Sequence, residues 1–130
     1  SGPYSTVIGG TGNTISGTRS TIIGGFGITG TTNDMVYVPN LTIASQGKLY
    51  IATGGTNPSA GVATLVGGTV TVNTSKATAS SIIMLTHQNN SGTVGSVSVS
   101  ARVVNTSFTI TSTSGTDTST IGWVIIEPAT

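Results

Sequence analysis

A six-residue segment near the start of the chain recurs fifteen positions later. Residues 5–10 read STVIGG and residues 20–25 read STIIGG, and NTISG at 13–17 forms a weaker half-repeat between them. A fixed period of this kind is typical of a solenoid, because one coil alone cannot bury its apolar side and must stack on its neighbours. We therefore expect a glycine-rich β-repeat segment with its connector, a shaft, over residues 1–45.

The rest of the composition also favours strands. Thr, Val and Ile number 26, 13 and 13 in a chain of 130 residues. These β-branched side chains are stiff at χ1 and fit the pleated surface of a sheet. The 19 Gly and 4 Pro interrupt every apolar run before a helical period is established. The predicted fold class is all-β, almost free of α-helix.

The second half of the chain predicts a different module. Its apolar runs recur at the spacing of about 8 to 12 residues that is typical of a sandwich or barrel. We expect a small antiparallel β-sandwich or jelly-roll-like domain over residues 61–130, a tip or knob. Residues 46–60 then form a linker, since GGTNP at 54–58 is a turn cluster. The six expected strands are 62–66, 69–73, 81–87, 94–103, 107–113 and 120–127.

Side-chain alternation indicates which faces are buried. Val97, Val99 and Ala101 alternate with serines, so they share one face. By contrast, IIML at 82–85 and WVII at 123–126 are continuous apolar runs, which favours strands covered on both faces. In so short a domain another subunit could supply the second cover. The residues expected to pack in the core or between three subunits are Ile8, Ile23, Ile82, Leu85, Trp123 and Ile125.

The repeats resemble the head repeats of trimeric autotransporter adhesins and similar repeats in phage and viral tail fibres. DMVYVPNLTI at 34–43 is similar to the connector that closes such repeats. The stretch from Gly61 to Pro128 resembles a C-terminal domain of phage structural proteins, on the segments ATLVGGTVTV at 63–72, GTVG at 92–95, SFTITS at 107–112, DTST at 117–120 and WVIIEP at 123–128. The resemblance implies a homotrimer in the virion, outside the cell, joined to an upstream part of the same fibre.

Charge and cysteine content exclude several classes of function. The charged residues are Arg19, Lys48, Lys76 and Arg102 against Asp34, Asp117 and Glu127, too few for a nucleic-acid patch. Without cysteine there is neither a disulfide nor a thiolate metal site. No apolar run approaches the roughly 18 residues of a membrane span. Residues 1–3, SGP, read as the remnant of a cleaved tag. We expect no cofactor, no nucleic-acid partner and no membrane insertion.

Two sequence features bear on an enzymatic function: a glycine-rich motif and the three carboxyl groups. Residues 25–30, GFGITG, match the letters of a dinucleotide fingerprint, but no helix signal follows them. A polysaccharide depolymerase commonly uses two positioned carboxyl groups. Asp34 and Asp117 read as turn residues and Glu127 as the solvated end of the last strand. We therefore expect no enzyme, with a depolymerase site at a subunit interface as the alternative.

A polar run at the end of an apolar strand is the predicted receptor contact. Exposed loops on a rigid β-scaffold commonly carry recognition, and amides hydrogen-bond sugars well. Three symmetry copies of the histidine could hold a metal ion, although a plain strand-end residue fits the pattern better. The run comprises His87, Gln88, Asn89, Asn90 and Ser91.

The predicted function is a structural module of a phage fibre or spike that can also contact a host receptor or glycan. The alternatives are a fragment of a bacterial trimeric adhesin, the depolymerase, and an ice-binding solenoid. An adhesin should continue into a stalk, whereas residues 127–130 end the chain directly after a strand, as in a tip. The threonine repeat ends near Thr32, too early for a regular ice-binding array.

Overall fold

The computed structural model describes residues 2–51, 53 and 55–128. Within these residues the secondary structure consists of strands and turns without a helix, so the all-β prediction is confirmed. No helix in this described part is therefore available to cross a membrane. The chain divides into two compact units, residues 1–49 and 50–130. The boundaries at 45 and 60 stay a prediction, and Ser1, Gly54 and the chain end at 129–130 lie outside the described residues.

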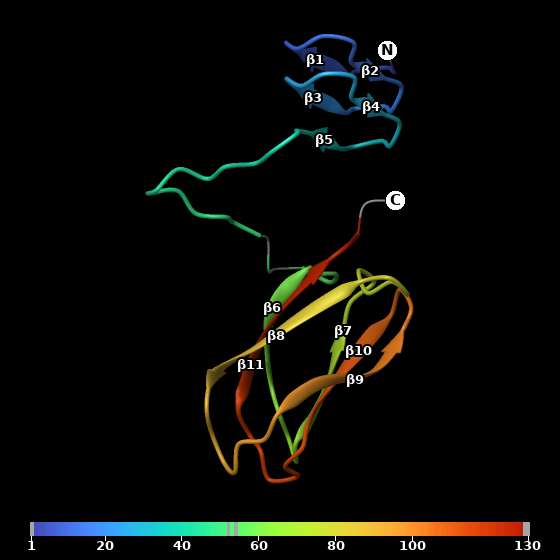
Figure 1. The fold of residues 1–130 in the computed structure, drawn as a ribbon. Helices are drawn as coiled ribbons and strands as arrows, with labels where there is room; N and C mark the ends of the chain where they lie inside the picture. The colour runs from blue at the N-terminus through green and yellow to red at the C-terminus, as the bar shows by residue number, and fades with distance from the viewer. Residues whose placement is uncertain (1, 52, 54, 129–130) are drawn as a thin grey trace. The chain divides into compact units, whose positions relative to one another are not determined.

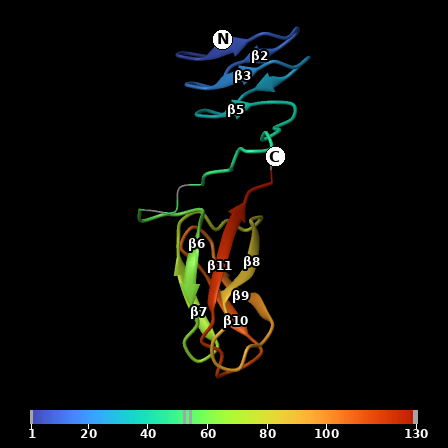
Figure 2. The ribbon, with the colours of Figure 1, turned by 90° about the vertical axis from the view of Figure 1, so that its left-hand side faces the viewer.

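The first unit is a parallel β-coil with a repeat of fifteen residues. Strands β1 (Thr6–Ile8), β3 (Thr21–Ile23) and β5 (Val36–Tyr37) form one sheet, and β2 (Thr14–Ile15) pairs with β4 (Thr29–Gly30) in another. Every pairing joins residues fifteen apart, as in Thr6 with Thr21 and Thr21 with Val36. Successive turns of the coil lie one above another (Figures 1 and 2). The segment expected as a connector thus begins with a third rung, β5.

Buried apolar side chains and the hydroxyl of a buried serine, Ser20, hold the coil together. Ile15 and Ile22 fill its interior, with exposed fractions of 3% and 0%. The hydroxyl of the buried Ser20 donates to the Thr32 carbonyl at 2.8 Å and accepts from the Met35 amide at 3.1 Å. Each turn also contains one left-handed residue that is not glycine, Tyr4, Arg19 or Asp34, at φ of 59°, 54° and 60°. The interior contacts and the turns therefore repeat with the same period as the sequence.

The second unit is a two-layered antiparallel sandwich (Figure 1). All six predicted strands are present. One sheet has the order β7-β10-β9 and the other β6-β11-β8, and every pairing is antiparallel. The strands are β6 (Ala60–Thr64), β7 (Thr69–Asn73), β8 (Ile82–Asn89), β9 (Val97–Val103), β10 (Ser107–Ser112) and β11 (Thr120–Ile126).

The core of the sandwich lies between the two sheets. Phe108 and Trp123 meet edge to face with ring centroids 5.3 Å apart, and Phe108 is completely buried. Apolar residues alternate with polar ones on β10, which places Phe108 and Ile110 inside and Thr109 outside. The buried cluster comprises Leu65, Val72, Ala77, Phe108, Ile110, Ile121, Trp123 and Ile125.

Three of the expected packing residues do not enter the core of this chain. Ile8, Ile23 and Ile82 are 56%, 46% and 54% exposed, whereas Trp123 and Ile125 are buried and Leu85 is half-buried. The reason is the two-residue period of a strand, which turns alternate residues of an apolar run outward. Within one chain, the strand at residues 82–85 is therefore buried on one face only. Packing of the exposed isoleucines between subunits stays a prediction.

A bulge moves one further residue from its expected face. The register of β9 against β10 shifts between Thr109 and Ile110, so that Ala101 faces Thr109 while Val99 faces Ile110. An extra residue in one strand reverses the alternation that follows it. Ala101 is consequently exposed, although the sequence pattern placed it with Val97 and Val99.

Candidate functional site

The outer surface of the sheet β6-β11-β8 is apolar. We call this surface the apolar face. Its most exposed members are Val62, Met84, Ile82 and Ile126, with exposed fractions of 67%, 55%, 54% and 47%. No residue of the three strands carries a formal charge. Exposed apolar areas of this kind mark contact surfaces in soluble proteins.

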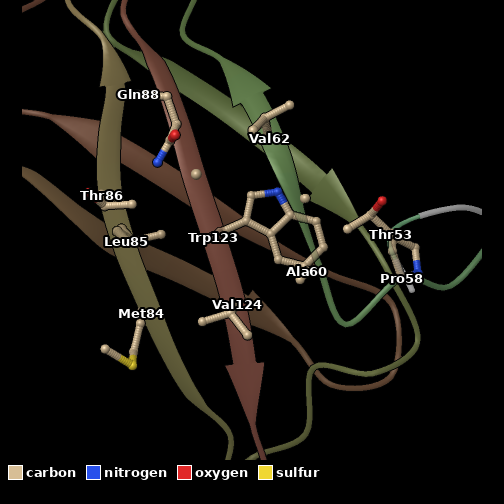
Figure 3. Close-up of a pocket in the computed structure, with 12 residues that line it drawn as sticks. Thr53, Pro58, Ala60, Val62, Met84, Leu85, Thr86, Gln88, Trp123 and Val124 are labelled. Atoms are coloured by element: carbon tan, nitrogen blue, oxygen red, sulfur yellow. The ribbon is translucent and has the colours of Figure 1, made fainter. Parts of the chain in front are cut away.

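A hollow of about 710 Å³ lies on this sheet. Figure 3 shows most of its lining side chains on the three strands, with Val124 of β11 beside Met84 of β8, while Thr53 and Pro58 come from the segment before β6. Gly122 has no side chain of its own, and the Gln88 side chain covers it, because an added Cβ would come within 2.7 Å of Gln88 Nε2. The cavity is thus a mostly apolar hollow that also contains one amide.

Trp123 lies directly beneath this recess. Its indole extends from β11 toward β6 (Figure 3), and a Cβ on Gly61 would lie only 2.9 Å from indole Cζ2. The position therefore requires glycine. The indole nitrogen Nε1 is buried without a hydrogen-bond partner among the described residues. The tryptophan is a core residue, as the sequence indicated.

The outer surface of the other sheet is covered with hydroxyl groups. We call it the hydroxyl face; it comprises Thr69, Thr71, Ser98, Ser100, Thr109 and Thr111. Cross-strand pairs join these hydroxyls, at 3.2 Å between Thr71 and Thr109 and at 2.6 Å between Ser100 and Thr111. One sheet of the sandwich thus presents a polar face and the other an apolar one.

The same division occurs in the coil. Ile8, Ile23 and Val38 are fifteen residues apart and point outward, with 56%, 46% and 37% of their surface exposed. We call these three residues the coil ladder. On the opposite sheet the outward residues are the threonines Thr14 and Thr29. Each unit therefore has one outward sheet with a row of apolar side chains, accompanied in the coil by Thr6 and Thr21, and one that is rich in hydroxyls.

The predicted receptor run, residues 87–91, does not form one surface. His87 faces the interior, and its Nε2 is buried with no hydrogen-bond partner in the part of the chain that the structure describes, while Gln88 lies over the hollow. Ser91 is fixed by Thr118, whose hydroxyl donates to it at 2.9 Å. Asn89 and Asn90 are exposed. The alternation of β8 separates these side chains, and receptor contact through the run stays a prediction.

Asp117 occupies a buried anion site that the sequence did not indicate. Its carboxylate accepts hydrogen bonds from the Gly95 amide at 3.0 Å, the Ser112 hydroxyl at 2.7 Å and the Ser119 amide at 2.9 Å. These donors, the Gly95 amide foremost, hold the pKa of Asp117 far below its usual range. A turn residue was expected here. The carboxylate instead joins the loop before β9 to the loop before β11.

The other two carboxyl groups are exposed and hydrogen-bonded. Asp34 accepts hydrogen bonds from Nε and Nη2 of Arg19, at 2.6 and 2.9 Å, and this lowers the pKa of Asp34 and raises that of Arg19. Glu127 accepts from the Ser81 and Thr78 hydroxyls, which lower its pKa. Within the described residues no three His, Cys, Asp or Glu side chains gather as a metal site would require.

Comparison with known protein families gives a match over the whole sandwich. Residues 57–126, more than half of the chain, match the family described as "K1 capsule-specific polysaccharide lyase, C-terminal domain". The chain belongs to this family. No curated protein matches the chain. The matched range contains β6 to β11, so both the apolar face and the hydroxyl face belong to the family domain.

The family corrects one prediction and supports another. The prediction that the chain is no enzyme is wrong, because the matched family is by description the C-terminal domain of a polysaccharide lyase. The carboxyl groups gave no indication of this family, because Asp34, Asp117 and Glu127 are each held by separate hydrogen-bond donors and no two of them form a catalytic pair. The likeness to phage tail spikes, drawn from the C-terminal segments, is supported by the same match.

Proposed function

We propose that this chain is a module of a virion tail spike that acts on a bacterial capsular polysaccharide, and that it works as a homotrimer. The observation that supports the proposal is the K1-lyase C-terminal domain at residues 57–126, following a fifteen-residue β-coil. Of the predicted alternatives, the adhesin fragment has no such support, and the depolymerase gains from the family description.

The surfaces of the two units favour an assembly around an axis. Each unit has one apolar and one hydroxyl-rich outward sheet. Closed cyclic symmetry is the rule for homo-oligomers, and it lets the copies of a unit all turn an apolar sheet toward the shared axis. The hydroxyl-rich sheets would then face water and any glycan. With only seven formally charged residues, the chain depends on such hydroxyls for its solubility.

Within the spike, the module would contact polysaccharide as well as join subunits. Hydroxyl and amide groups exchange hydrogen bonds with sugars without requiring a charged partner. The hydroxyl face and the exposed amides of Asn89 and Asn90 provide such groups on rigid strands. A second candidate function, favoured by the family description, is lyase action by the assembled chain itself, at a site between subunits.

Two measurements on the full chain test the proposal. Light scattering should give three times the chain mass of 12.8 kDa. The protein should then sediment with K1-encapsulated cells and not with an acapsular strain of the same species. A monomer would refute the assembly, and equal sedimentation with both strains would refute capsule recognition.

Incubation with purified K1 capsular polysaccharide separates the two candidate functions. A lyase leaves an unsaturated sugar at the new chain end, which absorbs ultraviolet light, and shortens the polymer. A rise in absorbance with falling viscosity would show lyase action by this chain. Binding without either change would assign the cleavage to another part of the spike.

A further inference from the structure

The apolar face of the sandwich and the coil ladder are two separate surfaces, and either could join subunits. We infer that the apolar face of β6-β11-β8 is a subunit interface, occupied by the same face of other copies of this chain. The inference rests on the proposed homotrimer and names the surface that forms it. Three properties of the face support a second copy as the occupant.

The first property is the absence of charge. Around a cyclic axis the residues nearest the axis meet their own copies, so a charged side chain there would face the same charge. The strands β6, β8 and β11 contain no Asp, Glu, Lys or Arg, and their outward residues Val62, Met84 and Val124 are apolar. The face can therefore meet itself without repulsion.

The second property is its contrast with the hydroxyl face of the same domain. A polysaccharide needs hydrogen-bonding groups, and the apolar face offers these at Thr86 and Gln88 and at the hydroxyl pair Thr64 and Thr120 toward one end of the sheet. The hydroxyl face offers six hydroxyls on three adjacent strands. A glycan would therefore favour the hydroxyl face, while burial of the apolar one requires a partner of like composition.

The third property is the shape of the face. Val62 of β6 and Met84 of β8, more than half exposed, project on either side of β11 and both line the hollow. A surface with both projections and a recess can interlock with a copy of itself, as core side chains do. The hollow of about 710 Å³ would then be filled by apolar side chains of the neighbouring subunit.

Two glutamate variants test the inference. Val62→Glu places a carboxylate on the apolar face, and Thr71→Glu places one on the hydroxyl face; both positions are exposed and lie on edge strands. Burying an unpaired charge should weaken association by at least about 100-fold in Val62→Glu. Light scattering should show dissociation of Val62→Glu on dilution, whereas Thr71→Glu should keep the mass of the unchanged protein. The emission of Trp123 checks that both variants fold.

Thiol labelling gives a second test that perturbs the fold less. The chain has no cysteine, so Val62→Cys and Thr71→Cys each introduce a single thiol. In the assembled protein a maleimide should label Val62→Cys at least about tenfold more slowly than Thr71→Cys, because reaction requires access. Both should react equally in denaturant.

The outcomes separate this inference from the proposed function. A trimer in which Val62→Cys labels as fast as Thr71→Cys would place the subunit contact elsewhere, for example at the coil ladder, and would overturn the inference alone. The inference would also be overturned if Val62→Cys became reactive once a bound apolar ligand was removed, because the ligand and not a second subunit would then cover the face. A monomeric unchanged protein would refute the inference and the homotrimer together.

Discussion

Replacement of Phe108 by alanine should strongly destabilise the sandwich without affecting the coil. Phe108 is fully buried and packs edge to face on Trp123 with centroids 5.3 Å apart. Truncation of a buried Phe to Ala costs about 3 to 5 kcal/mol through lost burial and the cavity left behind. The lost aromatic pair contributes about 0.5 to 1.5 kcal/mol of that cost. The expected loss in the free energy of unfolding is therefore near 4 kcal/mol.

The single tryptophan makes this measurement specific to one unit. Trp123 is the only tryptophan of the chain and lies in the sandwich core at 6% exposure, so its emission reports unfolding of that unit. With a urea m-value of about 1 to 2 kcal/mol/M, a loss of about 4 kcal/mol lowers the midpoint by about 2 to 4 M. The variants must be compared at equal protomer concentration, because assembly adds to apparent stability.

Phe108→Leu is the matched control. It keeps an apolar side chain of considerable volume at the same position and should cost much less, under about 1.5 kcal/mol where the core repacks. An alanine variant whose free energy of unfolding lies within about 1 kcal/mol of that of the leucine variant would show that the two sheets do not pack through Phe108. The reasoning about the core would then fail.

Three further substitutions test the buried anion and the coil. Asp117→Asn should lower the melting temperature at pH 7 but flatten its fall in acid: the depressed pKa of Asp117 means that its contribution is complete above about pH 4 and is lost below it. An unchanged acid response would contradict this role. Gly10→Ala should disrupt the coil measured by circular dichroism, since the new Cβ would overlap the Gly25 carbonyl, whereas Gly9→Ala, with open space at a similar φ, should cost only about 1 to 2 kcal/mol. Ser20→Ala should lower the free energy of unfolding by about 1 to 3 kcal/mol and speed amide exchange in the coil. Unchanged exchange would argue against a stabilising role of the Ser20 hydroxyl.

Periodic features of this protein were predictable from its sequence. The fifteen-residue offset between STVIGG and STIIGG is the register in which β1 and β3 pair. Alternation on β10 correctly placed Phe108 and Ile110 inside. The third rung at β5 was missed because VY at 36–37 keeps the spacing of the repeat but none of its letters. Strand pairing depends only on the fifteen-residue spacing, whereas a repeat in a sequence is identified by matching residue types.

Features that depend on tertiary contacts were not predictable. The bulge at Ala101 leaves no mark in the alternating run around it. The donors that surround Asp117 come from Gly95, Ser112 and Ser119, and only the fold brings the loop containing Gly95 to this carboxylate. The chemistry of the family was missed for a related reason: a domain can belong to a lyase without displaying a pair of catalytic carboxyl groups in its own sequence.

The left-handed residues Tyr4, Arg19 and Asp34 give the coil a constant increment of length. Inserting one further unit of fifteen residues would lengthen it by one strand spacing, about 4.8 Å, while every hydrogen-bonding partner kept its neighbour. Inserting fourteen or sixteen residues would move a different residue into the left-handed position of the turn and would point side chains outward that now point inward. The length of the coil can therefore change only in whole rungs, without altering the pairing of the rungs that remain.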